Sequence, residues 1–257
     1  MTERGSVVAV VAHPDDESLI AGGTLALAAR AGADCGVVAL TRGELGPISD
    51  AALATPATLG DVREAELGAA ARLLGASWSA CLRHPDGELP WADRDGSVDE
   101  LAAALAPHAP TVLLTFGADG VYGHHDHAAA GEIAAAALER LGTPASLYES
   151  VWAPGLVSEL AAAAAQRGLA TGLWDIEPEA FGSRGVEATL VLDVRPVLDS
   201  KLAALRAHRT QLGPGHLLAA LPGDLAERFL AHEAWRLVCG EDRLAALKAW
   251  EAREWRS

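Results

Sequence analysis

The 257-residue chain is half hydrophobic, contains only 5% aromatic residues and carries a formal net charge of −15. This length suffices for one large α/β domain with an ample hydrophobic core. Because a nucleic-acid partner requires a basic face on the protein, the acidic composition argues against a protein that binds a phosphate backbone.

Short apolar runs alternate with longer helix-forming segments along the chain. Strands are expected at residues 7–12, 35–41, 78–82, 112–116, 146–152 and 186–194. Helices are expected at residues 18–31, 61–74, 98–105, 128–141, 158–167, 196–209, 225–238 and 242–255. This alternation predicts an α/β, Rossmann-like fold with a mostly parallel sheet and helices on both faces. No repeat or linker divides the chain, so we expect a single domain over 1–257, with a C-terminal helical part from about residue 196 packed on it.

The cysteines and the amino terminus indicate the compartment. The three cysteines, Cys35, Cys81 and Cys239, have no paired spacing and do not support a disulfide framework. The amino terminus lacks the pattern of a signal peptide, and no stretch reaches the roughly 20 apolar residues of a membrane span. We therefore expect a cytoplasmic protein without a membrane span. The sequence does not decide between a monomer and a homo-oligomer.

The first expected strand ends in a group of polar residues. Six small and β-branched residues are typical of a buried parallel strand, and His13, Pro14, Asp15, Asp16 and Glu17 follow directly. Open parallel sheets bind ligands beyond the carboxyl ends of their strands. His13 and Asp16 can face one site, because Pro14 turns the chain and the next helix presents positions three apart on one side. This spacing is typical of a metal site, although it is also common in helix caps and surface ion pairs.

A second histidine cluster follows another strand. His124, His125, Asp126 and His127 come after the expected strand at 112–116 and a glycine-rich loop. Structural histidines have no reason to gather at two strand ends. Imidazole and carboxylate ligands, with one coordination position left for water, are typical of a catalytic zinc site. The residues alone do not rank the three histidines of this cluster as ligands.

Together the two clusters make the chain similar to the PIG-L/LmbE family of zinc-dependent de-N-acetylases. The motifs AHPDDE and GHHDH carry the resemblance, and TRGE at 41–44, Arg63-Glu64, Pro85-Asp86-Gly87 and KLAALRAHRTQ at 201–211 support it. The family includes N-acetylglucosaminyl-phosphatidylinositol deacetylase and deacetylases of the mycothiol and bacillithiol pathways. Where relatives usually read GHPDH, this chain has His125 in place of proline, which leaves open whether His125 reaches the metal.

The resemblance implies a zinc ion bound by His13, Asp16 and His127. It implies that Asp15 is the general base. Because zinc lowers the pKa of a coordinated water to about 7, a carboxylate base suffices. His124 would stabilise the oxyanion, with Tyr122 as a second donor, and Asp126 would orient an imidazole. A carboxylate such as Asp126 is also expected to raise the pKa of His124, so that the imidazole donates in its charged form.

Substrate contacts also follow from the resemblance. Glu44, Arg63 and Asp86 match family positions that bind sugar hydroxyls, although Arg63 also reads as an exposed helix charge and Asp86 as a turn residue. Glu17 reads either as a charge at a helix N-terminus or as a partner of a ligand. For His208 the sequence provides no physical role.

The favoured hypothesis is a zinc-dependent hydrolase that removes an acetyl or acyl group from an N-acyl amine. Its expected substrate is an N-acetylglucosamine-type sugar or a glycosylated natural-product intermediate. A second hypothesis is an amidase acting on a larger amide, such as a mycothiol conjugate or a non-sugar secondary metabolite. A third, from another class, is a non-catalytic sugar-binding α/β module, which the intact His and Asp motifs argue against.

Overall fold

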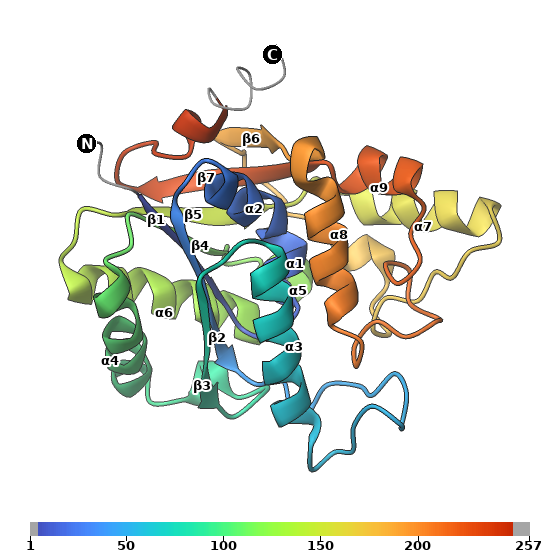
Figure 1. Cartoon of the computed structure of the whole chain (residues 1–257), viewed down its shortest axis with the longest axis horizontal. Coiled ribbons are helices and arrows are strands. Elements are labelled where there is room, and N and C mark those ends of the chain that lie inside the picture. The colour runs from blue at the N-terminus through green and yellow to red at the C-terminus, as the bar shows by residue number, and fades with distance from the viewer. Residues whose placement is uncertain (1–4, 249–257) are drawn as a thin grey trace.

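The computed structural model describes residues 5–248, and its centre is one seven-stranded sheet (Figure 1). The strands are β1 (Ser6–Val11), β2 (Asp34–Thr41), β3 (Trp78–His84), β4 (Val112–Phe116), β5 (Ser146–Val151), β6 (Leu190–Asp193) and β7 (His232–Cys239). Their order across the sheet is β3-β2-β1-β4-β5-β7-β6. The strands from β3 to β5 in this order pair in parallel, whereas β7 pairs antiparallel with both β5 and β6. The predicted α/β fold with a mostly parallel sheet is confirmed.

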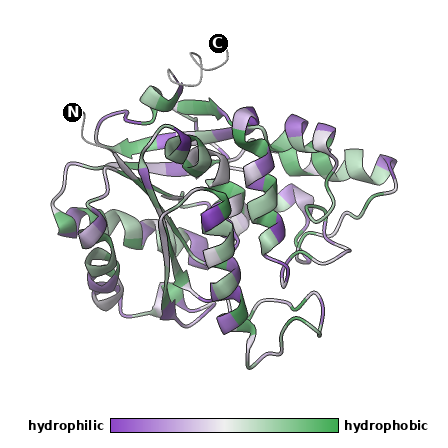
Figure 2. Cartoon of the chain, in the orientation of Figure 1, coloured by the Kyte–Doolittle hydropathy of each residue, from purple (hydrophilic) through white to green (hydrophobic). Residues whose placement is uncertain are grey.

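Helices cover both faces of the sheet, as predicted. Helices α4 (Arg94–Leu105) and α6 (His125–Leu141) lie on one face, and α2 (Gly22–Arg30), α3 (Leu59–Leu73) and α8 (Leu198–Ala207) lie on the other (Figure 1). The remaining helices are α1 (Asp16–Ile20), α5 (Gly120–Gly123), α7 (Leu156–Gln166) and α9 (Gly223–Leu230). In Figure 2, hydrophobic and hydrophilic residues alternate along α3 and α8. This pattern is typical of helices that pack on a core with one side and meet water with the other.

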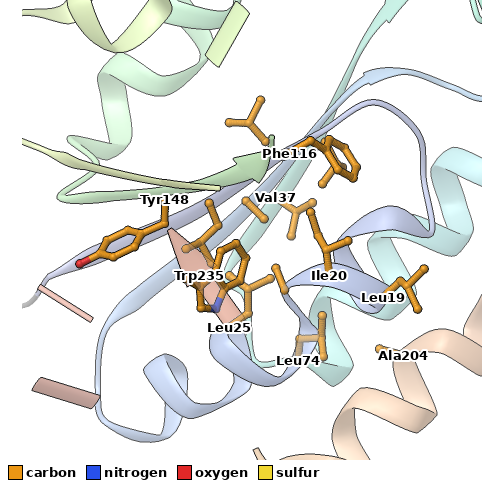
Figure 3. Packing of buried hydrophobic residues seen from close by; sticks show 14 of the residues in the cluster. Leu19, Ile20, Leu25, Val37, Leu74, Phe116, Tyr148, Ala204 and Trp235 are labelled. Atoms are coloured by element: carbon orange, nitrogen blue, oxygen red, sulfur yellow. The ribbon is translucent and has the colours of Figure 1, made fainter. Parts of the chain in front are cut away.

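The buried core explains the apolar run of the first strand. All six residues of β1 are buried, because helices cover both faces of the sheet at its centre. Trp235 of β7 and Leu25 of α2 lie close together in the core, and both side chains are fully buried (Figure 3). The antiparallel β7 therefore contributes to the same core as the parallel strands.

Two expected helices differ from the structure, and a third lies partly outside the described residues. The helix expected at 225–238 is wrong in its second half, where β7 begins at His232. Pairing with β5 and burial of Trp235 override the helix-forming composition there. The helix expected at 18–31 is two helices separated at Ala21. The helix expected at 242–255 extends into residues 249–257, which lie outside the described residues.

None of the helices within residues 5–248 combines the length and the apolar character that a membrane crossing demands.

The strand order reverses between β1 and β4. From β1, the chain places β2 and β3 on one side, and it later places β4 and β5 on the other. The carboxyl ends of β1 and β4 therefore lie side by side at a topological switch point, which is the usual ligand crevice of an open α/β sheet. The two polar clusters of the sequence follow these two strands.

Candidate metal centre and active site

The loop after β1 brings three polar residues to the switch point. The backbone N–H of His13 donates to the Asp16 carboxylate at 2.8 Å, which fixes these two residues relative to each other. Between them, Asp15 has a φ of 120°, a conformation that residues other than glycine rarely adopt. Backbone strain of this kind costs on the order of 1–3 kcal/mol and is concentrated at functional sites.

The loop between β4 and α6 contains a second strained residue. Val121 is buried and has a φ of 68°, which is a genuine outlier for a β-branched residue. The Asp119 carboxylate accepts its N–H at 2.9 Å. Further along, a Cβ on Gly131 would lie 2.4 Å from the carbonyl oxygen of Phe116, so only glycine lets α6 pass this close to β4. This close approach brings His127, on the first turn of α6, to the loop after β1.

His13, Asp16 and His127 form a buried cluster whose ligand atoms lie within 4.8 Å of one another. Nδ1 of His13 lies 3.3 Å from one Asp16 oxygen, and Nε2 of His127 lies 3.3 Å from the other. Nδ1 of His127 lies 3.0 Å from the carbonyl oxygen of Gly120 and therefore carries the ring proton. Its Nε2 then presents a lone pair, and this buried atom has no hydrogen-bond partner in the described chain. The donor set therefore fits a metal ion.

His13 also faces a second pair of carboxylates. Its Nε2 lies 3.2 Å from Asp86 and 3.3 Å from Asp126, and these three residues are a second group with metal-binding spacing. However, Asp86 and Asp126 already accept backbone N–H groups at 2.8 to 3.1 Å. A proton on Nε2 of His13 satisfies both carboxylates and leaves Nδ1 facing Asp16, as in metal sites where a histidine ligand donates its other N–H to a carboxylate. We therefore favour the set that contains His127.

The ionisation of the two aspartates differs. Burial opposes the ionisation of Asp16, but the imidazoles of His127 and His13 hold the pKa of its carboxyl well below its usual range. Burial raises the pKa of the Asp15 carboxyl to about 6, with Arg63 opposing the shift and Asp16 adding to it. The Asp16 carboxyl is thus an anion at all ordinary pH values. The Asp15 carboxyl titrates close to neutral pH, which suits proton transfer.

Arg63, expected to contact substrate, is buried and tied to the Asp15 loop. Its side chain is not the exposed helix charge of the alternative interpretation. It donates to the carbonyl oxygens of Gly43 and Pro14 at 2.8 and 2.6 Å, and it lies 3.2 Å from Asp15. Its guanidinium therefore anchors this loop, and the side chain also lines the cavity of the site.

Glu44 and Asp86, the other expected substrate contacts, lie together. One Glu44 oxygen accepts the N–H of Asp86 at 3.1 Å, and the other is buried without a partner among the described residues. Asp86 lines the cavity while contacting His13. The structure therefore brings Glu44 and Asp86 to the edge of the site, and it ties Asp86 to a metal-ligand candidate.

His124 and Tyr122 complete the polar side of the site. Burial, together with His127 and His13, lowers the pKa of His124 to about 4. Asp126 does act to raise this pKa, as expected, but burial and the neighbouring imidazoles outweigh the carboxylate, so the expectation of a charged imidazole is wrong. His124 caps α6 by accepting the N–H of Asp126 on Nδ1 at 3.2 Å, so the neutral ring carries its proton on Nε2. Burial, followed by the nearby Asp16 and Asp15 carboxylates, raises the pKa of Tyr122, which remains a hydroxyl donor.

A cavity of about 430 Å³ opens onto these groups. Its polar lining includes His13, Asp15, Asp16, Asp86 and His124. Its apolar lining is formed by Leu19, Leu45, Pro47, Trp174, Ile176, Leu205 and Leu212. The cavity therefore combines the polar groups of the metal-binding cluster with a hydrophobic lining.

The chain is similar to known proteins over nearly all of its length. Residues 8–138 match the family described as PIG-L: GlcNAc-PI de-N-acetylase. The 1D-myo-inositol 2-acetamido-2-deoxy-alpha-D-glucopyranoside deacetylase of Rhodococcus opacus is 35% identical, and the match covers 98% of each chain. The chain belongs to the PIG-L family. The family prediction, and with it the prediction of a hydrolase of the de-N-acetylase type, is confirmed.

Solved structures agree on the fold. The N,N'-diacetylchitobiose deacetylase of Pyrococcus horikoshii is 21% identical with a TM-score of 0.60, covering 92% of this chain and 84% of that one. The 4-carboxy-2-hydroxymuconate hydratase GalB of Pseudomonas putida is 22% identical with a TM-score of 0.64, covering 92% and 97%. At these identities the likeness shows the fold alone. Because one of the two is a hydratase, the fold does not decide the reaction.

His125, where the family resemblance led us to expect proline, does not line the cavity. Its side chain is 53% exposed, and its Nε2 lies 3.1 Å from the carbonyl oxygen of Gly87. The ring stacks on His124 and tilts against the exposed Trp91. His125 belongs to neither group of potential ligands.

Two residues that the sequence left without a role, or missed, border the site. His208, at the end of α8, lies 2.8 Å from Glu17, and both side chains are fully buried. Gln211 lines the cavity and donates to the carbonyl oxygen of Pro47 at 2.9 Å. The family-like segment at 201–211 was the available signal, but it provides no distance to the motifs near residue 13.

Proposed function

We propose that this PIG-L protein is a zinc-dependent de-N-acetylase of an N-acetylglucosamine-type amino sugar. The observation that carries the proposal is the buried set of His13, Asp16 and His127, with an unpartnered Nε2 on His127, next to Asp15, which lines the cavity. Two imidazoles and one carboxylate are a donor set that zinc uses in hydrolases. Membership of a de-N-acetylase family supports an amide as the bond that is cleaved.

In the proposed reaction, His13, Asp16 and His127 hold the metal. A zinc ion there would polarise the amide carbonyl and lower the pKa of a water. Asp15 accepts the proton of the water that attacks the amide carbon, and its pKa of about 6 leaves it ionised at neutral pH. Asp126 and Asp86 accept the Nε2 proton of His13 and thereby orient its Nδ1.

The developing oxyanion requires donors in the polar lining of the cavity. Neutral His124, with its proton on Nε2, and the Tyr122 hydroxyl are the proposed donors. Both residues line the cavity, and their rings meet edge to face at 5.7 Å between centroids. Preorganised donors of this kind need no reorganisation as charge develops on the amide oxygen.

The proposed substrate-binding residues are Glu44, Arg63 and Asp86. Glu44 lies just outside the cavity lining and accepts the N–H of Asp86, so it would act on the sugar through Asp86. Arg63 and Asp86 line the cavity, although both also make contacts within the protein. The Rhodococcus relative, named as a deacetylase of a 2-acetamido-2-deoxyglucopyranoside of inositol, supports an amino sugar as the acyl-bearing group.

A second candidate is an amidase for a larger amide. The apolar lining with Trp174, Ile176 and Leu212 favours it, because an inositol group offers little apolar surface to these residues. The two candidates share the metal, the base and the bond type. The two candidates differ in the part of the substrate that contacts the apolar residues of the cavity.

The test is amine release by metal-stripped protein reloaded with zinc. We expect turnover of 1D-myo-inositol 2-acetamido-2-deoxy-α-D-glucopyranoside, measured as free amine and acetate, and none by the metal-free protein. N-Acetylglucosamine and N-octanoylglucosamine form the matched pair for the apolar lining. A clear preference for the N-octanoyl sugar selects the second candidate. No amine from any of these substrates by zinc-loaded protein would overturn both.

We further propose that the enzyme works in the cytoplasm as one domain on a soluble small molecule. The net charge of −15 argues against a nucleic-acid partner, and the single sheet that joins strands from both halves of the chain supports one domain. Size-exclusion chromatography with light scattering would determine whether it is a homo-oligomer.

A further inference from the structure

A buried ion pair that the proposed reaction does not use lies behind the Asp15 loop. Nε2 of His208 lies 2.8 Å from Oε1 of Glu17, and neither side chain is exposed. Nδ1 of His208 has no hydrogen-bond partner in the described chain, so the ring donates to Glu17 from Nε2. Burying such a pair costs several kcal/mol in desolvation, and a pair of this kind is weak evidence for a role in stability alone.

The second carboxylate oxygen of Glu17 connects the His208–Glu17 pair to the backbone of Asp15. Oε2 of Glu17 accepts the backbone N–H of Asp15 at 3.0 Å. This N–H belongs to the strained residue, with φ 120° and ψ −29°. Such a conformation persists only when neighbouring contacts maintain it. Arg63 contacts the carboxylate of Asp15 and donates to the carbonyl oxygen of Pro14, which holds both groups in place. Glu17 holds the Asp15 N–H between them.

We propose that His208 is a positioning residue for Asp15 and acts through Glu17. Its hydrogen bond, together with that of the Ser18 hydroxyl to the same oxygen, fixes the Glu17 carboxylate, which in turn keeps the Asp15 backbone in the conformation that directs the base to the reacting water. The inference rests on the proposed function, in which Asp15 is that base. Neither His208 nor Glu17 lines the cavity, so neither touches the substrate. A displacement of about 1 Å in a catalytic group can cost on the order of a hundredfold in rate.

The same helix provides a matched control. Lys201 of α8 forms a comparably buried ion pair with Glu233, at 2.7 Å and with side-chain exposures of 2% and 4%. Glu233 accepts the N–H groups of Gly23 and Thr24 at the start of α2. Loss of Lys201 therefore removes a buried pair from α8 without removing a contact of Asp15.

The kinetic test compares His208→Leu, His208→Gln and Lys201→Met in zinc-loaded full-length enzyme, with 1D-myo-inositol 2-acetamido-2-deoxy-α-D-glucopyranoside as the substrate. We expect His208→Leu to lower kcat roughly ten- to hundredfold, with KM and zinc content within about twofold of the wild type. His208→Gln keeps an N–H donor for Glu17 and should recover most of kcat. Lys201→Met should keep kcat within about threefold even where its thermal midpoint falls as far as that of His208→Leu. Equal losses of kcat in His208→Leu and Lys201→Met would overturn the positioning role.

A crystal structure of His208→Leu separates this inference from the proposed function. The Asp15 backbone should leave the positive-φ region once Glu17 is held by the Ser18 hydroxyl alone. Asp15 retaining a φ near 120° would overturn the proposal, whatever the kinetics. If the zinc-loaded wild type releases no amine at all, the proposed function fails, and the Asp15 backbone in the variant still decides whether His208 positions it.

Discussion

Replacing His124 tests whether the proposed oxyanion donor is neutral or charged. With its pKa lowered to about 4, His124 is neutral throughout the physiological range, and its Nε2–H is the donor. A metal held by His13, Asp16 and His127 would add positive charge nearby and lower this pKa further. A requirement for protonated His124 would make the rate fall as pH rises through its pKa. Since that pKa lies near 4, the wild type should show no falling limb from His124 between about pH 6 and 9.

The size of the loss in kcat separates a catalytic role of His124 from its role as the cap of α6. Loss of one oxyanion donor costs on the order of a hundred- to a thousandfold in kcat. Loss of the α6 cap costs about 1 kcal/mol, which lowers the thermal midpoint by about 2–4 °C in a chain of this size. His124→Ala removes both functions, whereas His124→Asn keeps a good cap and removes the donor at the Nε2 position, which its shorter amide does not reach.

The assay is therefore kcat against pH, thermal midpoint and zinc content for both variants. We expect equal losses of kcat in His124→Ala and His124→Asn, a lower midpoint in His124→Ala alone, and unchanged zinc. Two results would refute the reasoning. One is wild-type kcat in His124→Asn. The other is a falling limb near neutral pH in the wild type that disappears in both variants, because it would mean that the charged imidazole is the donor.

Three further predictions concern the metal and the base. His127→Ala should lose zinc, because one of three protein ligands is gone, while His125→Ala should keep a full equivalent by elemental analysis; equal zinc in both would overturn the ligand assignment. Asp15→Asn should keep zinc and lose roughly a hundred- to ten-thousandfold in kcat, together with the acid limb of the wild type at or below about pH 6; loss of zinc instead would make Asp15 a ligand. His125→Pro places proline at the first position of α6 and should leave zinc and kcat unchanged while stabilising the fold by about 0.4–1 kcal/mol in denaturant unfolding; a drop in zinc would mean that His125 reaches the metal.

The sequence predicts the parallel part of the sheet well, because its signals are local. An apolar run such as the one before His13 is too short for a helix and is bounded by polar residues, so it reads directly as a buried strand. The strand β7 could not be read in this way. Trp235 and its neighbours have a composition that permits a helix, and only pairing with β5 and burial against α2 select the strand. Those contacts join positions far apart in the chain.

The site also has features that local sequence predicts and features that depend on distant contacts. His13, Asp16 and His127 stand in two compact motifs, and the strand order brings the motifs together at a switch point that parallel sheets share. The protonation of His124 could not be predicted, because it depends on burial and on imidazoles from both motifs. The contact between His208 and Glu17 spans 191 positions of the sequence and has no local signal at all.

The excess of buried carboxylates leads to a last prediction, on the pH dependence of metal binding. Burial alone would lower the pKa of His13, but hydrogen bonds with Asp126, Asp16 and Asp86 raise it well above 6.5. Without a metal, His13 is therefore cationic at neutral pH and carries protons on both nitrogens. A metal requires the lone pair of Nδ1, so its binding must release a proton from His13, while the Nε2 proton stays between the carboxylates.

Zinc affinity should consequently rise with pH by close to tenfold per pH unit around neutrality, and titration calorimetry in buffers of different ionisation enthalpy should report release of about one proton. Asp126→Asn weakens the hold on the His13 proton, so it should reduce the proton release near pH 7 while zinc still binds. A pH-independent affinity for zinc between about pH 6 and 8 would mean that His13 is already neutral in the metal-free protein, or that it is not a ligand. The metal content of His13→Ala distinguishes these two explanations. If His13 is a ligand, the variant loses zinc, and if it is not, the variant retains zinc.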